Sequence, residues 1–86
     1  MTLDRKKILV TGASGGIGSE IVRTLCEAGA SVGIHCHSDL GTAEDLCSEM
    51  LQAGGGHRVY QADLIETDSP VRLVESFLED YGGIDA

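Results

Sequence analysis

Basic residues are scarce in this sequence: 6 Lys and Arg stand against 14 Asp and Glu, for a formal net charge of -8 at pH 7. Nucleic acids and anionic membrane surfaces are bound mainly through clustered positive charge. The composition therefore argues against both as partners. An anionic ligand would have to be held by local groups, such as main-chain amides at the start of a helix.

The sequence also lacks long apolar runs and paired cysteines. No stretch approaches the roughly 18 apolar residues that a membrane span needs, and residues 1–7 contain no apolar signal core. The three cysteines, Cys26, Cys36 and Cys47, are odd in number and have no Cys-x-x-Cys spacing. Free thiols in a reducing compartment fit this pattern better than a disulfide scaffold does. We therefore expect a cytoplasmic protein.

The 86 residues contain no internal repeat, linker or low-complexity tract, which indicates a single unit. Short apolar runs such as Ile8-Leu9-Val10 predict strands buried on both faces, and apolar residues three and four apart predict helices. The expected strands are 7–11, 31–36 and 57–62, and the expected helices are 16–28, 41–53 and 67–81. For the last helix the predicted buried stripe is Val71, Val74, Phe77, Leu78 and Tyr81.

This alternation of strands and helices predicts an α/β fold with right-handed crossovers. We expect a Rossmann-type doubly wound parallel sheet truncated to its first three βα units, with strand order 3-2-1. Residues 1–86 would form the N-terminal dinucleotide-binding half of one domain, cut before the fourth strand, because residues 82–86 are too short to form it. The outer edge of the first strand would then be unpaired, and we expect self-association through it.

A glycine-rich stretch, Thr-Gly-Ala-Ser-Gly-Gly-Ile-Gly at residues 11–18, lies between the first predicted strand and helix. In dinucleotide folds one glycine makes a tight turn, one admits the pyrophosphate and one lets the helix pack closely. Gly12, Gly16 and Gly18 stand at these positions, in the strand–turn–helix context that the motif requires. A P-loop is excluded, because no Gly-Lys-Ser/Thr follows at the needed spacing.

These residues, together with Ala62-Asp63-Leu64 and the ending Tyr-Gly-Gly-Ile-Asp at 81–85, resemble the short-chain dehydrogenase/reductase family. Residues 29–38 are most similar to the beta-ketoacyl-acyl-carrier-protein reductase group. Gly15 also permits the Thr-Gly-x-x-Gly-x-x-Gly pattern of the extended, epimerase-like branch. The full-length second helix and the ending favour the shorter branch.

The resemblance implies that the chain binds a dinucleotide, and it assigns a set of residues to that task. Thr11 would brace the turn, Asp63 would accept a hydrogen bond from the adenine amino group, and Leu64 would line the same pocket. The implied cofactor-binding residues are Gly12, Ser14, Gly15, Gly16, Ile17, Gly18, His37, Ser38, Asp63 and Leu64.

The end of the second strand indicates which dinucleotide is bound. An acidic residue there binds the ribose 2′-OH of NAD, whereas basic or small polar groups accommodate a 2′-phosphate. The chain has Cys36-His37-Ser38 there, with Asp39 one residue too late, so we expect NADP, with NAD as the alternative. The arginine usual in NADP-type members is missing, and Gly15 replaces the basic residue often found in the loop.

His35 and His37 could share one face of their strand, but without further spaced ligands they do not predict a metal site, and we expect ordinary surface or pocket-edge histidines. The family's chemistry is hydride transfer between a nicotinamide and a carbonyl or alcohol, and it depends on a Tyr-x-x-x-Lys motif. Leu64 follows Tyr60 and Asp85 follows Tyr81 at that spacing, and the family's Asn-Asn-Ala-Gly motif is also absent. We therefore expect no catalytic residue and no catalysis in these 86 residues. A standalone nucleotide-binding module and an interaction fragment that binds nothing remain as alternatives.

Overall fold

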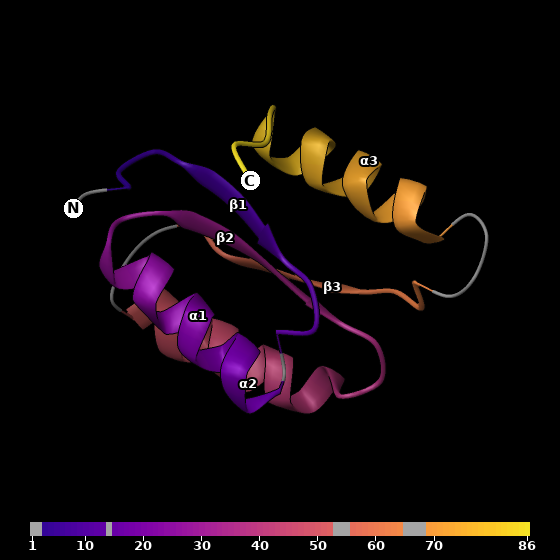
Figure 1. Cartoon of the computed structure of the whole chain (residues 1–86), viewed down its shortest axis with the longest axis horizontal. Helices are drawn as coiled ribbons and strands as arrows, with labels where there is room; N and C mark the ends of the chain where they lie inside the picture. Colours follow the sequence, from indigo (N-terminus) through magenta and orange to yellow (C-terminus); the bar gives the residue numbers. More distant parts are fainter. Residues whose placement is uncertain (1–2, 14, 53–55, 65–68) are drawn as a thin grey trace.

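The computed structural model describes residues 3–13, 15–52, 56–64 and 69–86, and the chain alternates strands and helices throughout (Figure 1). The elements are β1 (Lys7–Val10), α1 (Gly16–Glu27), β2 (Ser31–Cys36), α2 (Leu40–Gln52), β3 (Arg58–Gln61) and α3 (Ser69–Tyr81). All six predicted elements are present, and no end differs by more than two residues from the expected one. Residues 53, 67 and 68, which the predicted helices included, lie outside the described residues.

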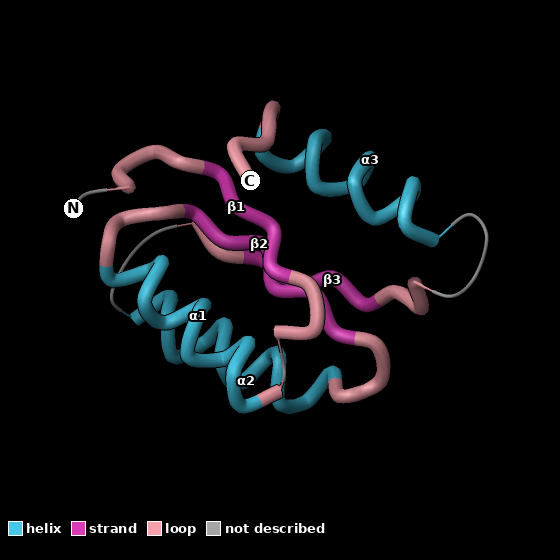
Figure 2. The backbone as a smooth tube through the Cα atoms, in the orientation of Figure 1, coloured by secondary structure: helices cyan, strands magenta, loops and turns pink. Residues whose placement is uncertain are grey.

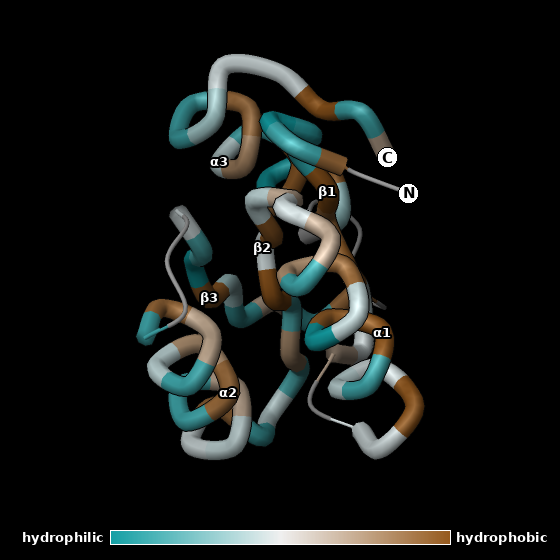
Figure 3. Tube along the Cα trace, turned by 90° about the vertical axis from the view of Figure 1, so that its left-hand side faces the viewer, coloured by the Kyte–Doolittle hydropathy of each residue, from teal (hydrophilic) through white to brown (hydrophobic). Residues whose placement is uncertain are grey.

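The three strands form a parallel sheet in which β2 lies between β1 and β3. Ile8 pairs with Val32, and Ile34 pairs with Val59. The predicted fold class and the predicted neighbours of each strand are thereby confirmed. Helices α1 and α2 cover one face of the sheet and α3 lies over the other, as Figures 1 and 3 show from two directions.

The face of the sheet under α1 and α2 carries the main hydrophobic core. Val32, Ile34 and Cys36 of β2 are each fully buried. Because successive side chains of a strand point to opposite faces, these three residues share the side toward the two helices. They pack with buried residues of the turn and helices: Ala13, Val22, Ala30, Ala43, Leu46, Cys47 and Met50.

Helix α3 covers the opposite face of the sheet. The stripe of residues that α3 buries differs from the predicted one. Leu73 and Phe77 are buried. Val71, Val74 and Leu78, which we expected to be buried, are 59%, 40% and 39% exposed. The prediction was right for Phe77 and wrong for these three residues, because the stripe that α3 buries runs through Leu73 and Phe77.

Phe77 is buried against β2. A Cβ atom built on Gly33 would lie 2.6 Å from the Phe77 ring, so the ring occupies the space that a side chain would need. Phe77 also stacks on Tyr81, with ring centroids 4.5 Å apart. This close fit buries the Phe77 ring against the sheet.

The exposure of β1 also differs from the prediction. All four residues of β1 are only partly buried, whereas five of the six residues of β2 are buried. In a three-stranded sheet β1 is an edge strand, and the expectation that it is buried on both faces was wrong. The strand buried on both faces is β2.

The outer edge of β1 is not left fully unpaired, which corrects another expectation. The Leu9 amide donates to the Ala86 carbonyl (2.8 Å), and the Ala86 amide approaches the Lys7 carbonyl (3.4 Å). These two contacts lie on either side of Ile8, as in a parallel ladder. The Asp85 carboxylate also accepts a bond from the Lys7 amide at 2.8 Å. Figure 2 shows the C-terminal end beside β1.

Within the described ranges, no helix is both long enough and apolar enough to cross a membrane.

Candidate functional site

The turn between β1 and α1 has the geometry that its glycines allow. Gly12 has a φ of +64°, a left-handed conformation that glycine adopts at little cost. A Cβ atom on Gly18 would lie 2.5 Å from the Gly12 carbonyl oxygen and 2.8 Å from Ala13 Cα. The first turn of α1 therefore packs directly against the turn that precedes it, and only glycine fits at Gly18.

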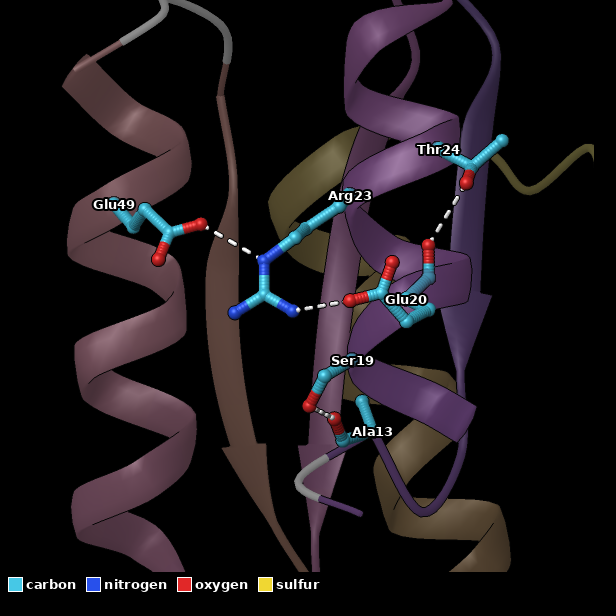
Figure 4. Close-up of polar contacts among 6 residues, drawn as sticks. All are labelled: Ala13, Ser19, Glu20, Arg23, Thr24 and Glu49. Carbon is cyan, nitrogen blue, oxygen red and sulfur yellow. Dashed lines mark hydrogen bonds and ion pairs between the residues drawn. The ribbon is translucent and has the colours of Figure 1, made fainter. Parts of the chain in front are cut away.

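Three hydrogen bonds tie this turn to its surroundings. The Gly12 amide donates to His35 Nδ1 at 3.0 Å, and the Ala13 amide donates to the His35 carbonyl at 2.8 Å. The Ser19 hydroxyl of α1 donates to the Ala13 carbonyl at 3.1 Å (Figure 4). Thr11, which we expected to brace the turn, is exposed, and the tethers come from His35 and Ser19. The Gly12 and Ala13 amides therefore already donate hydrogen bonds within the chain and do not serve as donors to a ligand.

The amides that can receive an anion lie further along, at the start of α1. Gly15 is the N-cap residue and contributes no side-chain cap. No hydrogen-bond acceptor for the Gly16 or Ile17 amide is found in the part of the chain that the structure describes. A Cβ atom on Gly16 would meet nothing within 4 Å, and Ile17 is 82% exposed. Unpaired amides at the positive end of a helix dipole fit a diphosphate.

A hollow of about 290 Å³ lies beside the turn and brings several of the predicted residues together. It is lined by Thr11, Gly12, His35, His37, Asp63 and Leu64. These residues come from the ends of β1, β2 and β3, where open parallel sheets bind their ligands. Ser38 is exposed and does not line the hollow. Ser14 lies outside the described residues.

His37 and Asp63, which the sequence assigned to different parts of the ligand, lie next to each other. His37 Nε2 is 3.4 Å from Asp63 Oδ2, and the His37 side chain is 63% exposed. The carboxylate can accept a hydrogen bond from an amino group, and the imidazole can donate to a phosphate. This pairing means that a ligand must compete with His37 for Asp63.

His35 is the residue that sequence reasoning missed. It is 3% exposed, and its Nε2 is 2.8 Å from the Ala62 carbonyl. Of the two expected locations, surface or pocket edge, His35 lies at the pocket edge: it lines the hollow, with its ring enclosed between the three strand ends. Strand alternation did predict that His35 and His37 share a face, and both line the hollow. Cys36 points to the core on the other side.

The two tyrosines are bound in structural contacts. The Tyr60 hydroxyl donates to Asp80 Oδ2 at 2.6 Å, and burial together with this carboxylate raises its pKa. The Tyr81 hydroxyl donates to the Val32 and Gly56 carbonyls, and burial raises its pKa to about 12. A tyrosine that transfers protons near neutral pH needs the opposite shift. Among the described residues, no group of three or more His, Cys, Asp or Glu side chains could hold a metal ion.

Comparisons with known proteins agree with this geometry. The chain is 39% identical over 88 residues to the L-rhamnose 1-dehydrogenase (NAD(P)(+)) of Azotobacter vinelandii, covering 99% of this chain and 34% of that protein. It is 35% identical over 77 residues to the short chain dehydrogenase/reductase AacuN of Aspergillus aculeatus, covering 90% of this chain and 29% of that protein. The chain therefore spans about a third of the length of these relatives. The relatives are various oxidoreductases and do not single out the beta-ketoacyl-acyl-carrier-protein reductases.

Solved structures agree as well. A short chain dehydrogenase from Burkholderia cenocepacia J2315 in complex with NADP superposes with a TM-score of 0.94 at 30% sequence identity, covering 99% of this chain and 35% of that one. The family profile described as short chain dehydrogenase matches residues 6–86. On this match, which leaves out only the first five residues, the chain belongs to the short-chain dehydrogenase family.

Proposed function

We propose that residues 1–86 are the N-terminal, NADP-binding half of the domain of an oxidoreductase that transfers hydride between the nicotinamide and a carbonyl or alcohol. The main observation that supports this proposal is the turn from Gly12 to Gly18. Its first amides are tethered internally, while the amides of Gly16 and Ile17, at the start of α1, have no acceptor among the described residues. A diphosphate needs this combination of a fixed backbone and free donors.

The residues around the turn fit the other parts of a dinucleotide. The Gly16 and Ile17 amides would bind the diphosphate, with Gly15 beside them at the N-cap. Asp63 would accept from the adenine amino group, and Leu64 would provide an apolar wall. The bound nicotinamide supplies the hydride chemistry.

The preference for NADP rests on the residues that follow β2. No carboxylate stands at positions 36–38, and the His37 and Ser38 side chains are exposed and can donate to a 2′-phosphate. A related solved structure is a complex with NADP, and the rhamnose dehydrogenase is described with NAD(P)(+). NADP is therefore the proposed cofactor, with NAD as the weaker ligand.

The reaction belongs to the whole protein. Neither Tyr60 nor Tyr81 has a lysine four residues on, and both hydroxyls are held in structural contacts with a raised pKa. We therefore expect these 86 residues to bind the cofactor without catalysing hydride transfer. The likeness of residues 29–38 to the beta-ketoacyl-acyl-carrier-protein reductases favours a 3-oxoacyl thioester as the substrate. The three free thiols favour a reducing compartment such as the cytoplasm.

The test is calorimetric titration of the chain with NADPH and NADH at equal ionic strength. A Gly16→Val variant should lose at least tenfold in affinity, because its side chain would occupy the space in front of the open amides. The matched control is Gly41→Val in the first turn of α2, where a Cβ atom also meets nothing within 4 Å. Equal NADPH affinity in Gly16→Val and wild type would contradict the proposal, and tighter binding of NADH would reverse the cofactor preference.

Self-association through the edge of β1 is part of the proposal. Ala86 pairs only with the Lys7 to Leu9 part of that edge. In a parallel strand the N–H and C=O groups of alternate residues point to the same side, so the Leu9 carbonyl and Thr11 amide face outward beyond Ala86. Multi-angle light scattering at increasing concentration should report a mass above that of the monomer. A monomeric mass at the highest concentration would contradict this expectation.

A further inference from the structure

His35 links the three parts of the chain that form the candidate site. It lies on β2, its ring accepts from the Gly12 amide, and its Nε2 lies 2.8 Å from the Ala62 carbonyl after β3. Its own carbonyl accepts from the Ala13 amide. One buried side chain and its backbone therefore fix two consecutive residues of the turn and the loop that carries Asp63.

The two ring contacts determine which tautomer His35 must have. The Gly12 amide is a donor, so Nδ1 must present its lone pair. The Ala62 carbonyl is an acceptor, so Nε2 must carry the proton. Both bonds are made only by the neutral ring protonated at Nε2. Protonating Nδ1 would place two N–H donors 3.0 Å apart at Gly12, and that hydrogen bond would be lost.

The Gly12 contact is coupled to the start of α1 by close packing. The Gly12 carbonyl lies against Gly18 so tightly that no Cβ atom fits between them. A shift of Gly12 therefore moves the first turn of α1, where the open Gly16 and Ile17 amides lie. The Ser19 to Ala13 bond is a second tether and contains no group that titrates near neutral pH.

Other titratable and charged groups face His35 from the elements around it. His37 and Asp63 line the same hollow. Tyr60 is the β3 residue paired with His35, and Arg72 of α3 lines the adjacent hollow with Ala62. Of these groups, His37 is the other imidazole, so the experiment must separate a change at His37 from a change at His35.

We propose that His35 is a positioning residue whose neutral ring holds the turn in its anion-binding form, so that protonating His35 weakens dinucleotide binding. The inference rests on the proposed function for its ligand, but its central contact can be measured without one. The side chain itself contacts no part of the bound dinucleotide in this proposal. It acts through the backbone of Gly12.

The first test is NMR spectroscopy of the ¹⁵N-labelled chain without ligand. At neutral pH we expect a scalar coupling across the hydrogen bond between Gly12 N and His35 Nδ1, and ¹⁵N shifts that report a proton on Nε2. Both should disappear together as the pH is lowered through the titration of His35. A ring protonated on Nδ1, or a Gly12 amide unaffected by that titration, would overturn the proposal.

The second test measures NAD⁺ affinity against pH, because the diphosphate diester of NAD⁺ does not change charge in this range. Wild type should lose at least tenfold in affinity as His35 is protonated. His35→Gln, which offers an uncharged donor and acceptor, should bind more weakly at neutral pH and lose this pH dependence. Ser19→Ala should bind more weakly with the same pH dependence as wild type, and His37→Asn should keep it as well.

The outcomes separate the two proposals. If the pH dependence disappears in His37→Asn and persists in His35→Gln, His37 is the titrating group and the role of His35 is overturned. If the coupling is present but NAD⁺ and NADPH bind at no pH, the proposed function fails while the Gly12 to His35 contact stands. If His35→Gln does not fold, the coupling and its loss on acidification in wild type still decide the proposal.

Discussion

The two faces of β2 are built on different principles. On the face toward α1 and α2, Val32, Ile34 and Cys36 are fully buried in a continuous apolar core. On the face toward α3, the same strand presents Gly33 and His35, and the contacts are an aromatic ring against a bare backbone and hydrogen bonds from an imidazole. Neighbouring residues of β2 therefore have different roles. Those on one face stabilise the apolar core, and those on the other face fix the positions of particular atoms.

This difference indicates which substitutions each face of β2 should tolerate. The core face gains its stability from buried apolar area, which any side chain of the right size supplies. The α3 face depends on positions of particular atoms, so it should respond to small changes of shape or protonation. The following predictions test this distinction, from the largest expected effect to the smallest.

Loss of volume should cost most where the side chain is fully buried. Ile34→Ala removes a fully buried side chain and should lower the free energy of unfolding by about 2–5 kcal/mol. Leu78→Ala on α3 removes a side chain that is 39% exposed and should cost about 0.5 kcal/mol. Urea denaturation followed by circular dichroism measures both. Equal losses would show that burial does not determine the cost of removing a side chain.

The α3 face should be the more sensitive to added volume. Gly33→Ala places a Cβ atom 2.6 Å from the Phe77 ring and should destabilise the fold by about 1–3 kcal/mol. In the Gly33→Ala/Phe77→Leu double variant the smaller side chain relieves the clash. A double-mutant cycle should therefore give a favourable coupling energy, and additive losses would show that the ring does not set the position of α3.

Alkaline pH should weaken the same face. Burial raises the pKa of Tyr81 from 10.0 to about 12, so its contribution to stability is complete below pH 10 and is lost as the pH rises toward 12. Tyr81→Phe should cost about 1 kcal/mol at neutral pH, because the Val32 and Gly56 carbonyls lose a donor. It should also flatten the fall in urea midpoint between pH 10 and 12. An unchanged slope would contradict the assignment.

The outer surface between the helices should matter least. Arg23 on α1 bonds Glu20 at 2.9 Å and reaches Glu49 on α2 at 2.9 Å (Figure 4). Exposed ion pairs contribute little, because water screens them and the side chains lose freedom. Arg23→Gln should leave the urea midpoint unchanged at physiological ionic strength. A clear loss that disappears at high salt would show that this pair holds α1 to α2.

The sequence predicted most of the architecture, because the order and type of the elements follow local patterns. Apolar residues three and four apart located α1 and α2, a short and partly β-branched run located β2, and the strand–helix alternation predicted the neighbours in the sheet. The Gly12, Gly16 and Gly18 spacing located the turn. Each of these signals is contained within a few consecutive residues.

The α3 face could not be predicted in the same way, because it depends on contacts between distant residues. The contact of α3 with the sheet depends on the fit of Phe77 to Gly33, which lie 44 positions apart in the chain. The role of His35 depends on the Gly12 amide, 23 positions away, and on the Ala62 carbonyl. Strand alternation placed His35 beside His37 but could not tell which of them is enclosed.

The free thiols give the chain built-in reporters of its own motions. Cys36 is fully enclosed beneath α1 and α2, Cys47 is nearly so, and burial raises the pKa of both. Only a thiolate reacts with an alkylating reagent, so modification must wait until the helices lift from the strand. The alkylation rate of each thiol would therefore report how often α1 and α2 separate from the sheet, without any engineered label.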